Sequence, residues 1–569
     1  MEIEDSNEIV NEFNKFFVSI ASHLKEPIQA SNFDRLETFC SNKVPEDTFF
    51  TIPEISIEKI TKFLTNIDTT KATGCDFIGP RLLKMSAPFI ADSIAYICNQ
   101  SITKSQFPDA WKEAKVTPLQ KSGPKDDINN YRPISILPVI SKVLEKHIHD
   151  SLMNFLTEYQ LLQKTQSGFR PNHSCETALV GMICRWLESI NQGSLIGAVM
   201  VDFKKAFDLV DHAVLLKKLK HYRLSSTTIS WFSSYLNNRR QKVSLHNAMS
   251  KDAIITDGVL QGSILGPLLF LLFINDLPLY TESSNTDMYA DDTTLYVCAK
   301  SHEDIQSSLQ MALDSLAKWC TCNGMIINTT KTKAMLITTH QKRATLTTEN
   351  LSLTLNSVDL NMISNDKILG VMIDNNLTWT HHIDKICKKM ASNLWLLSRI
   401  KTFLSREHRI QFYKTYIQPH IDYCNIIWGG TSQMNLNRVF RLQKRACKII
   451  LDYNVENILE SMKDLKILTI FDRLYLRKAK FMYKISIGEI PQYVNEMFQK
   501  KQINENEPQL RSASGQTFIT PKPNKEIFKQ SIAYSGPIIW NCLPPNLRSV
   551  ENINIFHSHF IKWILGPRT

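Results

Sequence analysis

The sequence lacks the features that would place this chain in a membrane or in an oxidising compartment. Its longest apolar run, Ile264 to Ile274, is too short to span a bilayer and is interrupted by a Gly-Pro pair. The first residues are acidic, without the basic and then apolar pattern of a signal peptide. The twelve cysteines are scattered, so neither a disulfide framework nor a zinc site is indicated. We therefore expect a soluble, intracellular protein that binds no membrane.

The bulk composition is compatible with a large soluble enzyme. The 569 residues suffice for several domains or one multi-lobed body, and 43% hydrophobic residues are enough for a sizeable core. A net charge of +11 suits a polyanionic partner, although a basic balance of this size is also typical of an ordinary surface. No internal repeat or low-complexity array is apparent in the sequence.

Two acidic elements stand out against this background. Asp291 and Asp292 lie between two apolar segments, a pattern that predicts a β-hairpin with both carboxylates at its turn. The apolar run Leu195 to Val201 ends in Asp202, which predicts a buried strand with a carboxylate after its last residue. Three carboxylates from two such elements could hold two Mg²⁺ ions about 3.5–4 Å apart, as nucleotidyl transfer requires. The alternative for the paired acids is an exposed acidic turn.

A glycine-punctuated loop, Gly258 to Pro267, separates the two acidic elements. It runs into an apolar helix with Pro267 near the first turn, a position that proline tolerates. Because glycine has no side chain, the backbone of this loop can approach a ligand closely.

These segments follow one another in the order and approximate spacing of reverse transcriptase motifs. The chain resembles most closely the reverse transcriptases of jockey-like non-LTR retrotransposons (LINEs). The similar segments cover about half of the chain, and they are residues 107–111, 130–135, 166–170, 202–208, 261–263, 289–292 and 367–371, with weaker similarity over 413–429 and 540–544. The segment 71–80 resembles a fingers motif, but Phe77 stands where the family has glycine.

The resemblance implies an α+β right-hand polymerase, with fingers, a palm that contains an antiparallel sheet, and a helical thumb. Periodicity predicts helices over 5–24, 56–67 and 304–319, and Lys367 to Asp374 is interpreted as a strand at the end of the palm. The expected division is 1–100, an N-terminal helical extension with the first fingers loop; 101–373, the fingers and palm; 374–450, a basic thumb; and 451–569, a C-terminal extension of unknown role.

The function implied is RNA-directed DNA polymerisation from a primer 3′-hydroxyl. Asp202, Asp291 and Asp292 would be the catalytic, metal-binding residues, with two Mg²⁺ ions or, alternatively, Mn²⁺. The partners would be template RNA, a DNA primer or target, and deoxynucleoside triphosphates. Two alternatives are a catalytically silent, RNA-binding relic of a mobile element and a group II intron or retron-type reverse transcriptase.

Several residues receive nucleotide-binding roles from the resemblance. Lys121 and Arg132, both flanked by turn residues, would contact the triphosphate, although a loop lysine is usually only solvated. Phe207, five positions after Asp202, would pack beneath the sugar and exclude a 2′-hydroxyl. The alternative for Phe207 is a core position beside Phe203.

Other family positions complete the nucleotide site. Gln261 and Gly262 would lie beside the incoming nucleotide. Lys331 would approach the leaving pyrophosphate and could donate a proton to it, with Lys333 as the alternative. His212 is interpreted as a hydrogen-bonded connector rather than a base.

Template and primer binding is assigned to basic residues on either side of the palm. Arg170 would meet the template backbone. The segment 381–450 holds thirteen Lys or Arg residues against three Asp or Glu. Concentrated positive charge after a palm is typical of a thumb that grips phosphates, although a charged helix face usually means only solvation. The thumb residues at helical spacing are Arg438, Arg441, Lys444, Arg445 and Lys448.

The sequence shows no candidate for the Glu/Asp/His set of the endonuclease that commonly precedes such a polymerase. We therefore expect nicking of the target from a missing N-terminal part or from another protein. The resemblance places DNA synthesis in the nucleus, with a cytoplasmic ribonucleoprotein as a further form.

Overall fold

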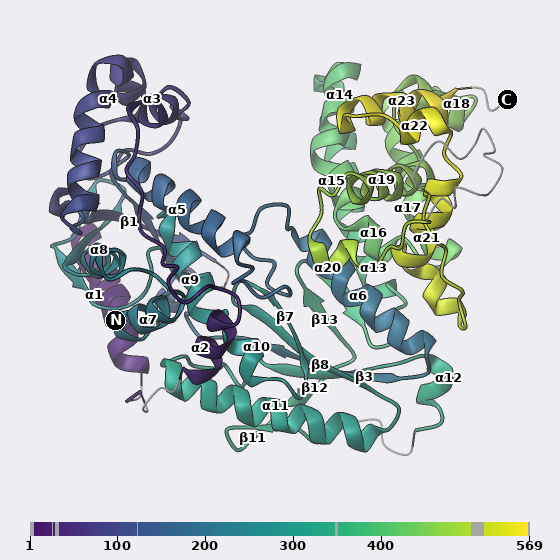
Figure 1. Cartoon of the computed structure of the whole chain (residues 1–569). Coiled ribbons are helices and arrows are strands. Elements are labelled where there is room, and N and C mark those ends of the chain that lie inside the picture. Colours follow the sequence, from purple (N-terminus) through teal and green to yellow (C-terminus); the bar gives the residue numbers. More distant parts are fainter. Residues whose placement is uncertain are drawn as a thin grey trace, which may run out of the picture. The chain divides into compact units, whose positions relative to one another are not determined.

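The computed structural model describes residues 5–25, 27–28, 33–121, 123–346, 351–501 and 517–566. The chain divides into two compact units (Figure 1). The first consists of Met1–Phe169, Val201–Glu282 and Met311–Lys331, and the second of Arg170–Met200, Ser283–Gln310 and Thr332–Thr569. Helices and sheets occur in both units, which confirms the expected mixture of α and β structure.

The first unit is built around a sheet with the strand order β2-β1-β4-β5, in which β6 also pairs with β4. Its strands are β1 (Glu113–Gln120), β2 (Tyr131–Ile136), β4 (Arg239–Leu245), β5 (Ala248–Met249) and β6 (Ala253–Ile255). Its helices are α1 (Ser6–Leu24), α2 (Asp34–Ser41), α3 (Ile57–Thr65), α4 (Pro80–Thr103), η1 (Asp109–Trp111), η2 (Ile128–Asn130), α5 (Ser141–Glu158), α7 (His212–His221), α8 (Ser226–Leu236), α9 (Leu265–Ile274) and α10 (Leu277–Tyr280).

Helix α1 shows how local sequence determines an element of this unit. The side chain of Asp5 accepts a hydrogen bond from the backbone N–H of Glu8 and thereby caps the first turn of the predicted helix. Phe13, Phe17 and Ile20 recur at helical spacing and are buried. The predicted helix over 56–67 is also confirmed, as α3.

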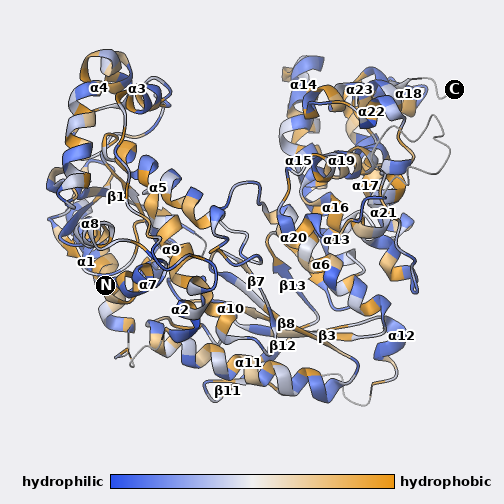
Figure 2. Cartoon of the chain, in the orientation of Figure 1, coloured by the Kyte–Doolittle hydropathy of each residue, from blue (hydrophilic) through white to orange (hydrophobic). Residues whose placement is uncertain are grey.

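Helix α9 forms the centre of the first unit and is the most apolar helix there, as its colour in Figure 2 shows. The buried carboxylate of Glu145 accepts hydrogen bonds from the backbone N–H groups of Ile264 (2.7 Å) and Leu265 (3.3 Å). An anion at a helix N-terminus satisfies N–H groups that have no partner within the helix. The Glu145 side chain therefore fixes the residue at which this uniformly apolar helix begins.

The second unit contains a sheet with the strand order β12-β9-β3-β8-β7 and two separate hairpins, β10-β11 and β13-β14. Its strands are β3 (Leu195–Val201), β7 (Asn285–Tyr289), β8 (Asp292–Ala299), β9 (Lys333–Ile337), β10 (Thr354–Leu355), β11 (Val358–Asp359), β12 (Asn361–Met362), β13 (Asn365–Ile368) and β14 (Val371–Asp374).

The remaining helices lie mostly in the second unit. They are α6 (Cys175–Asn191), α11 (His302–Asn323), α12 (His340–Arg343), α13 (Thr380–Ile400), η3 (Lys401–Phe403), α14 (Arg406–Phe412), the π-helical turn η4 (Tyr413–Ile417), α15 (Gln418–Asp422), α16 (Asn425–Trp428), α17 (Gln433–Ile450), α18 (Ile458–Asp464), α19 (Ile470–Ser486), α20 (Gln492–Asn495), η5 (Glu526–Gln530), α21 (Ile532–Asn541), α22 (Pro545–Arg548) and α23 (Ile553–Leu565). Helix α11 begins in the second unit and continues into the first, and it contains the predicted helix over 304–319.

Strand β3 is buried on both faces, as its continuous apolar sequence predicts. Ile196 and Ala198 belong to the apolar core that β3 shares with α6. On the opposite face, a Cβ at Gly197 would lie 2.3 Å from Ile305 of α11, so only glycine allows this helix to approach. The same core continues through the helices from α13 to α23, so described residues on both sides of 502–516 contribute to the packed body of this unit.

The structure corrects the strand predicted at 367–374 and describes part of the polar segment 504–525. Lys367 to Asp374 is not one strand but the hairpin β13-β14, because Leu369 (φ 44°) and Gly370 (φ 89°) form a left-handed turn. The polar composition of 504–525, with Pro508 and Gly515, is typical of a flexible linker, and residues 504–516 lie outside the described residues. In the described remainder Phe518 is fully buried, and the backbone N–H groups of Asn524 and Lys525 donate to Asn191.

Two expectations about the chain as a whole can be compared with the structure. All twelve cysteines are free in the structure, and six of them are buried. Within the described residues, no helix combines the length and apolar character needed to cross a membrane.

Candidate active site

Asp202 directly follows β3, as the sequence predicts, and its side chain is half-buried. Its backbone carbonyl accepts a hydrogen bond from the N–H of Asn328 at 2.7 Å. The next two residues are also held, because Phe203 forms a β-bridge with Ile327 and the N–H of Lys204 donates to the carbonyl of Ile326 at 2.8 Å. The backbone that carries Asp202 is thus fixed independently of its carboxylate.

The predicted hairpin is confirmed as β7 and β8, which pair antiparallel with Tyr289 opposite Asp292. The turn residues are Ala290 and Asp291, and Ala290 has a left-handed backbone (φ 58°) that favours glycine. Such strain is common at functional sites. Asp291 is half-buried at the turn, whereas Asp292 is exposed as the first residue of β8.

Sheet order relates the two acidic elements. Strand β3, which ends one residue before Asp202, is hydrogen-bonded to β8, which begins at Asp292. Among the described residues, His, Cys, Asp and Glu side chains form no group of three or more that could hold a metal ion by themselves.

The loop before α9 packs on the turn after Asp202. The N–H groups of Gly258 and Val259 donate to the carbonyls of Val210 (2.8 Å) and Phe207 (2.9 Å). His212 is the expected connector, with Nε2 at 2.8 Å from the carbonyl oxygen of Gly258. A Cβ at Gly258 would lie 2.9 Å from the carbonyl oxygen of Asp208. Gly258 therefore allows the loop to approach protein backbone, whereas the sequence suggested that it allows the loop to approach a ligand.

Gly262 is constrained in the same way. It has φ 134°, and a Cβ there would lie 2.1 Å from the carbonyl oxygen of Ser135 on β2. The N–H of Ser135 in turn donates to the carbonyl of Gln261 at 2.8 Å. The Gln261-Gly262 pair is thereby fixed against β2.

Phe207 is half-buried and packs between two other rings. It stacks on Phe270 of α9 with ring centroids 4.3 Å apart, and Phe169 meets it edge-on at 6.1 Å. The core alternative named Phe203 as its neighbour, but the ring contacts are with residues 169 and 270. Its role toward a sugar stays a prediction.

Three cations, Lys121, Arg132 and Lys205, lie beside the turn that follows Asp202. Lys121 directly follows β1, and Arg132 on β2 pairs with Leu119 in the β1-β2 ladder. Both side chains are exposed. Nζ of Lys205 lies 3.3 Å from the carbonyl of Asn129 and 3.4 Å from that of Tyr131.

Lys205 was not singled out from the sequence. Burial lowers the pKa of its ammonium group, and the charges of Lys121 and Arg132 lower it further, against the opposing charge of Asp208. The sequence signal that could have identified Lys205 is its position three residues after Asp202, inside the motif 202–208.

Asp208 holds the side chain of Gln261. Nε2 of Gln261 donates to Oδ1 of Asp208 at 3.1 Å. Burial raises the pKa of Asp208 to about 6, although the charges of Lys205 and Arg132 and the bond from Gln261 act in the opposite direction. The orientation of the Gln261 amide is therefore linked to a carboxyl group that titrates near neutral pH.

This arrangement predicts a pH-dependent nucleotide affinity. Above pH 6 Asp208 is a carboxylate, which can only accept hydrogen bonds and therefore holds the Gln261 amide in one orientation. Its neutral form can also donate a hydrogen bond, so it holds the amide less firmly. We expect KM for a deoxynucleotide to rise several-fold in the parent protein between about pH 7.5 and about pH 5. Asp208→Asn cannot titrate and should give a nearly flat KM across this range. An equally pH-dependent KM in the variant would contradict the assignment.

Protein stability provides the control. The raised pKa means that the neutral carboxyl group favours the folded state, so its contribution is complete below about pH 3.8 and is lost as the pH rises through about 6. Asp208→Asn should therefore melt no lower than the parent at about pH 7.5.

The two candidate lysines near the end of the polymerase motifs differ in their surroundings. Lys333 forms an ion pair with Asp366 at 3.1 Å. Lys331 is exposed, and its backbone N–H donates to the carbonyl of Asn328. An ion-paired lysine is less available to a leaving group, which favours Lys331 of the two.

The predicted nucleic-acid contacts lie in the second unit. Arg170 is half-buried, and burial lowers its pKa. The predicted basic helix is confirmed as α17, with Val439 and Ile449 buried on one face. Arg438 is ion-paired with Asp384, whereas the other basic residues of this set lie on the outer part of the helix, with Arg441, Arg445 and Lys448 exposed and Lys444 half-buried.

Comparison with known proteins shows which sequences this chain is similar to. Residues 121–373 match the family described as reverse transcriptase (RNA-dependent DNA polymerase). The matched segment resembles a reverse transcriptase domain. This domain contains all three aspartates, together with the loop at residues 258–262 and the cations at 121, 132 and 205.

Relatives extend the similarity beyond this domain. The chain is 30% identical over 428 residues to a probable RNA-directed DNA polymerase from transposon BS of Drosophila melanogaster, a match that covers 73% of this chain and 47% of that protein. It is 28% identical over 449 residues to the RNA-directed DNA polymerase from mobile element jockey of the same organism, covering 76% and 48%. The predicted resemblance to jockey-like reverse transcriptases is confirmed, and the chain spans about half the length of these curated relatives.

Proposed function

We propose that this chain copies an RNA template into DNA from a primer 3′-hydroxyl, as the polymerase of a jockey-like non-LTR retrotransposon. The observation that carries the proposal is the reverse transcriptase match over 121–373, which includes Asp202, Asp291 and Asp292. Asp202 directly follows β3, Asp291 lies in the turn before β8, and Asp292 is the first residue of β8.

The donor chemistry fits two Mg²⁺ ions, with Mn²⁺ as a substitute. Carboxylate oxygens are hard ligands, and Mg²⁺ is usually held by one or two of them together with water and substrate phosphates. When bound, the ions supply activation of the attacking 3′-oxygen and neutralisation of charge on the leaving pyrophosphate. We assign Asp202 and Asp291 as the principal ligands and Asp292, the exposed one, as a further ligand.

The remaining residues around the turn bind and select the nucleotide. Lys121 and Arg132 contact triphosphate oxygens, and Lys205 beside them adds a third cation. The ring of Phe207, fixed by Phe270, lies under the sugar and leaves no room for a 2′-hydroxyl. Gln261 and Gly262 line the nucleotide site, and Lys331 meets the pyrophosphate.

Arg170 and the basic residues of α17 hold the template and primer. Arg170 contacts the template backbone, and α17 presents the cations Arg438, Arg441, Lys444, Arg445 and Lys448 to phosphates. In this assignment residues 101–373 form the fingers and palm, and residues 374–450 form the thumb. Synthesis at a genomic target takes place in the nucleus and uses a 3′-hydroxyl from an endonuclease nick.

A primer-extension assay tests the proposal against the silent, RNA-binding alternative. The purified chain is incubated with an RNA template, an annealed DNA primer, deoxynucleotides and Mg²⁺, and RNA binding is measured on the same preparation. The proposal expects primer extension. Tight RNA binding without any extension, in Mg²⁺ or Mn²⁺, would favour the relic instead.

A further inference from the structure

Arg185 of α6 connects both strands of the hairpin that carries the paired aspartates. Its Nη2 donates to both carboxylate oxygens of Asp287 on β7 at 2.6 Å, and its Nε donates to the hydroxyl of Tyr296 on β8 at 2.7 Å. The adjacent Trp186 packs edge-on against the Tyr296 ring at 5.8 Å. One guanidinium group therefore joins α6, β7 and β8 four residues before Asp291.

This connection is rigid for physical reasons. The side chains of Arg185 and Asp287 are only 29% and 15% exposed. Charge-assisted hydrogen bonds to a planar guanidinium fix direction as well as distance, and they strengthen where water is excluded. Burial opposes the charge on Arg185, but Asp287 and Tyr296 outweigh it and raise the pKa of the guanidinium group.

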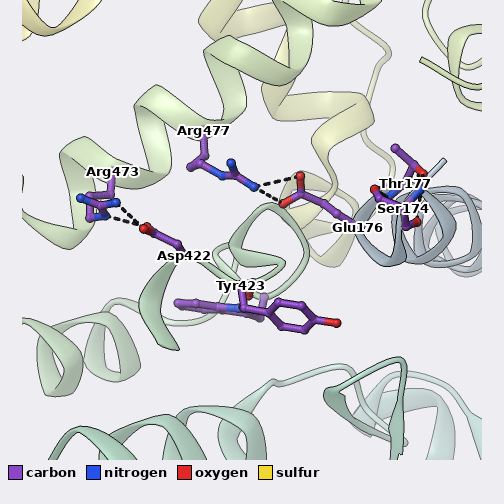
Figure 3. A network of polar contacts seen from close by, with 8 residues as sticks. Ser174, Glu176, Thr177, Asp422, Tyr423, Arg473 and Arg477 are labelled. Atoms are coloured by element: carbon purple, nitrogen blue, oxygen red, sulfur yellow. Dashed lines mark hydrogen bonds and ion pairs between the residues drawn. The ribbon is translucent and has the colours of Figure 1, made fainter. Parts of the chain in front are cut away.

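The C-terminal extension also holds α6, from the first turn of the helix to its last residue. At the first turn, Arg477 of α19 donates to both carboxylate oxygens of Glu176 at 2.8 and 3.0 Å (Figure 3). At the last residue, Oδ1 of Asn191 accepts hydrogen bonds from the backbone N–H groups of Asn524 (2.8 Å) and Lys525 (2.9 Å).

Two contacts at the middle of α6 lie near Arg185 itself. Sγ of Cys184 is 3.3 Å from Oγ of Ser531. Tyr493 packs where Gly181 has no side chain, since a Cβ there would be 2.5 Å from its ring, and the same ring lies 6.0 Å from the Arg185 guanidinium. The extension therefore contacts α6 along its whole length and also meets the connecting arginine.

We infer that five residues of the C-terminal extension brace α6, and that Arg185 transmits this brace to the turn that carries Asp291 and Asp292. The bracing residues are Arg477, Tyr493, Asn524, Lys525 and Ser531. Arg185 is a positioning residue, and the extension has a role in holding the reactive carboxylates. The catalytic part of this inference rests on the proposed polymerase function, whereas the mechanical part does not.

Hydrogen exchange of the hairpin amides tests the mechanical part directly. Arg185→Lys keeps the positive charge but cannot bond Asp287 and Tyr296 together. We expect exchange of the amides in 285–299 to speed up by about tenfold in this variant. The matched control is Arg473→Lys on α19, because Arg473 likewise donates to both carboxylate oxygens of one aspartate, Asp422, away from α6 (Figure 3).

A second pair of variants tests the extension without altering Arg185. Tyr493→Leu removes the ring beside Gly181 and Arg185 and should also speed exchange in 285–299, by a smaller factor. Tyr475→Leu is its control, since the Tyr475 ring contacts Phe560 and Trp563. Equal hairpin exchange in each variant and its control, for both pairs, would overturn the brace.

Kinetics tests the catalytic part. A misplaced carboxylate turn should lower kcat of Arg185→Lys by about 10- to 100-fold and raise the Mg²⁺ concentration for half-maximal rate, with KM for primer–template unchanged. A rise in that KM alone would contradict a positioning role. If the parent protein extends no primer while hairpin exchange still responds to Arg185→Lys, the brace is supported and the proposed polymerase function is rejected.

Discussion

Asp202→Asn is expected to slow primer extension in Mg²⁺ by about 10²- to 10⁴-fold, equivalent to about 3–5 kcal/mol of transition-state stabilisation. An amide has nearly the shape of the carboxylate but lacks the negative charge that balances a divalent cation. The fold should persist, because the backbone at Asp202 is held by its own hydrogen bond to Asn328 and by the Phe203–Ile327 bridge.

The measurement is the single-turnover extension rate at saturating nucleotide, together with the melting temperature. Asp304→Asn serves as the matched control, because Asp304 is an exposed aspartate on α11. The control should extend primers at nearly the parent rate. If Asp202→Asn also did so, Asp202 would not be a metal ligand.

Phe207→Val is expected to change which sugar is accepted. Replacing a ring that stacks on Phe270 at 4.3 Å with a shorter side chain opens space where the account places the 2′ position. A difference of one methylene group in a pocket corresponds to about 1–3 kcal/mol, so ribonucleotide use should rise by at least about 10- to 200-fold relative to deoxynucleotide use. Competing the two nucleotides on one primer–template measures this ratio.

The deoxynucleotide rate of the same variant is the internal control, because loss of packing would lower both rates together. An unchanged ratio in a folded, active variant would show that Phe207 is a core residue and not a steric gate.

The parts of the site that could be predicted from sequence depend on local patterns. The apolar run before Asp202 predicted β3, and alternating apolar segments around Asp291 predicted the β7-β8 hairpin. Both follow from a periodicity that is visible within ten residues. The helix α17 was predicted on the same basis.

The connections between these elements could not be predicted in this way. Arg185 meets Asp287 across 102 residues, and Arg477 meets Glu176 across 301, and no spacing rule relates such positions. Asp208 was visible as a polar residue, but its raised pKa arises from burial beside the Gln261 loop.

One local pattern was misinterpreted for a physical reason. The segment 367–374 reads as a strand apart from Gly370, and glycine inside a strand pattern indicates a bulge or turn. In the structure Leu369 and Gly370 are both left-handed, so the segment folds back as β13 and β14.

Omission of one nucleotide tests whether DNA synthesis on RNA follows the template. The purified chain receives an RNA template of known sequence, an annealed DNA primer, Mg²⁺ and only three of the four deoxynucleotides. We expect the primer to grow and stop one position before the first template base that pairs with the omitted nucleotide, and adding this nucleotide should release the stop. Growth without regard to the template sequence, or no growth by a folded protein that binds the RNA, would contradict templated DNA synthesis by this chain.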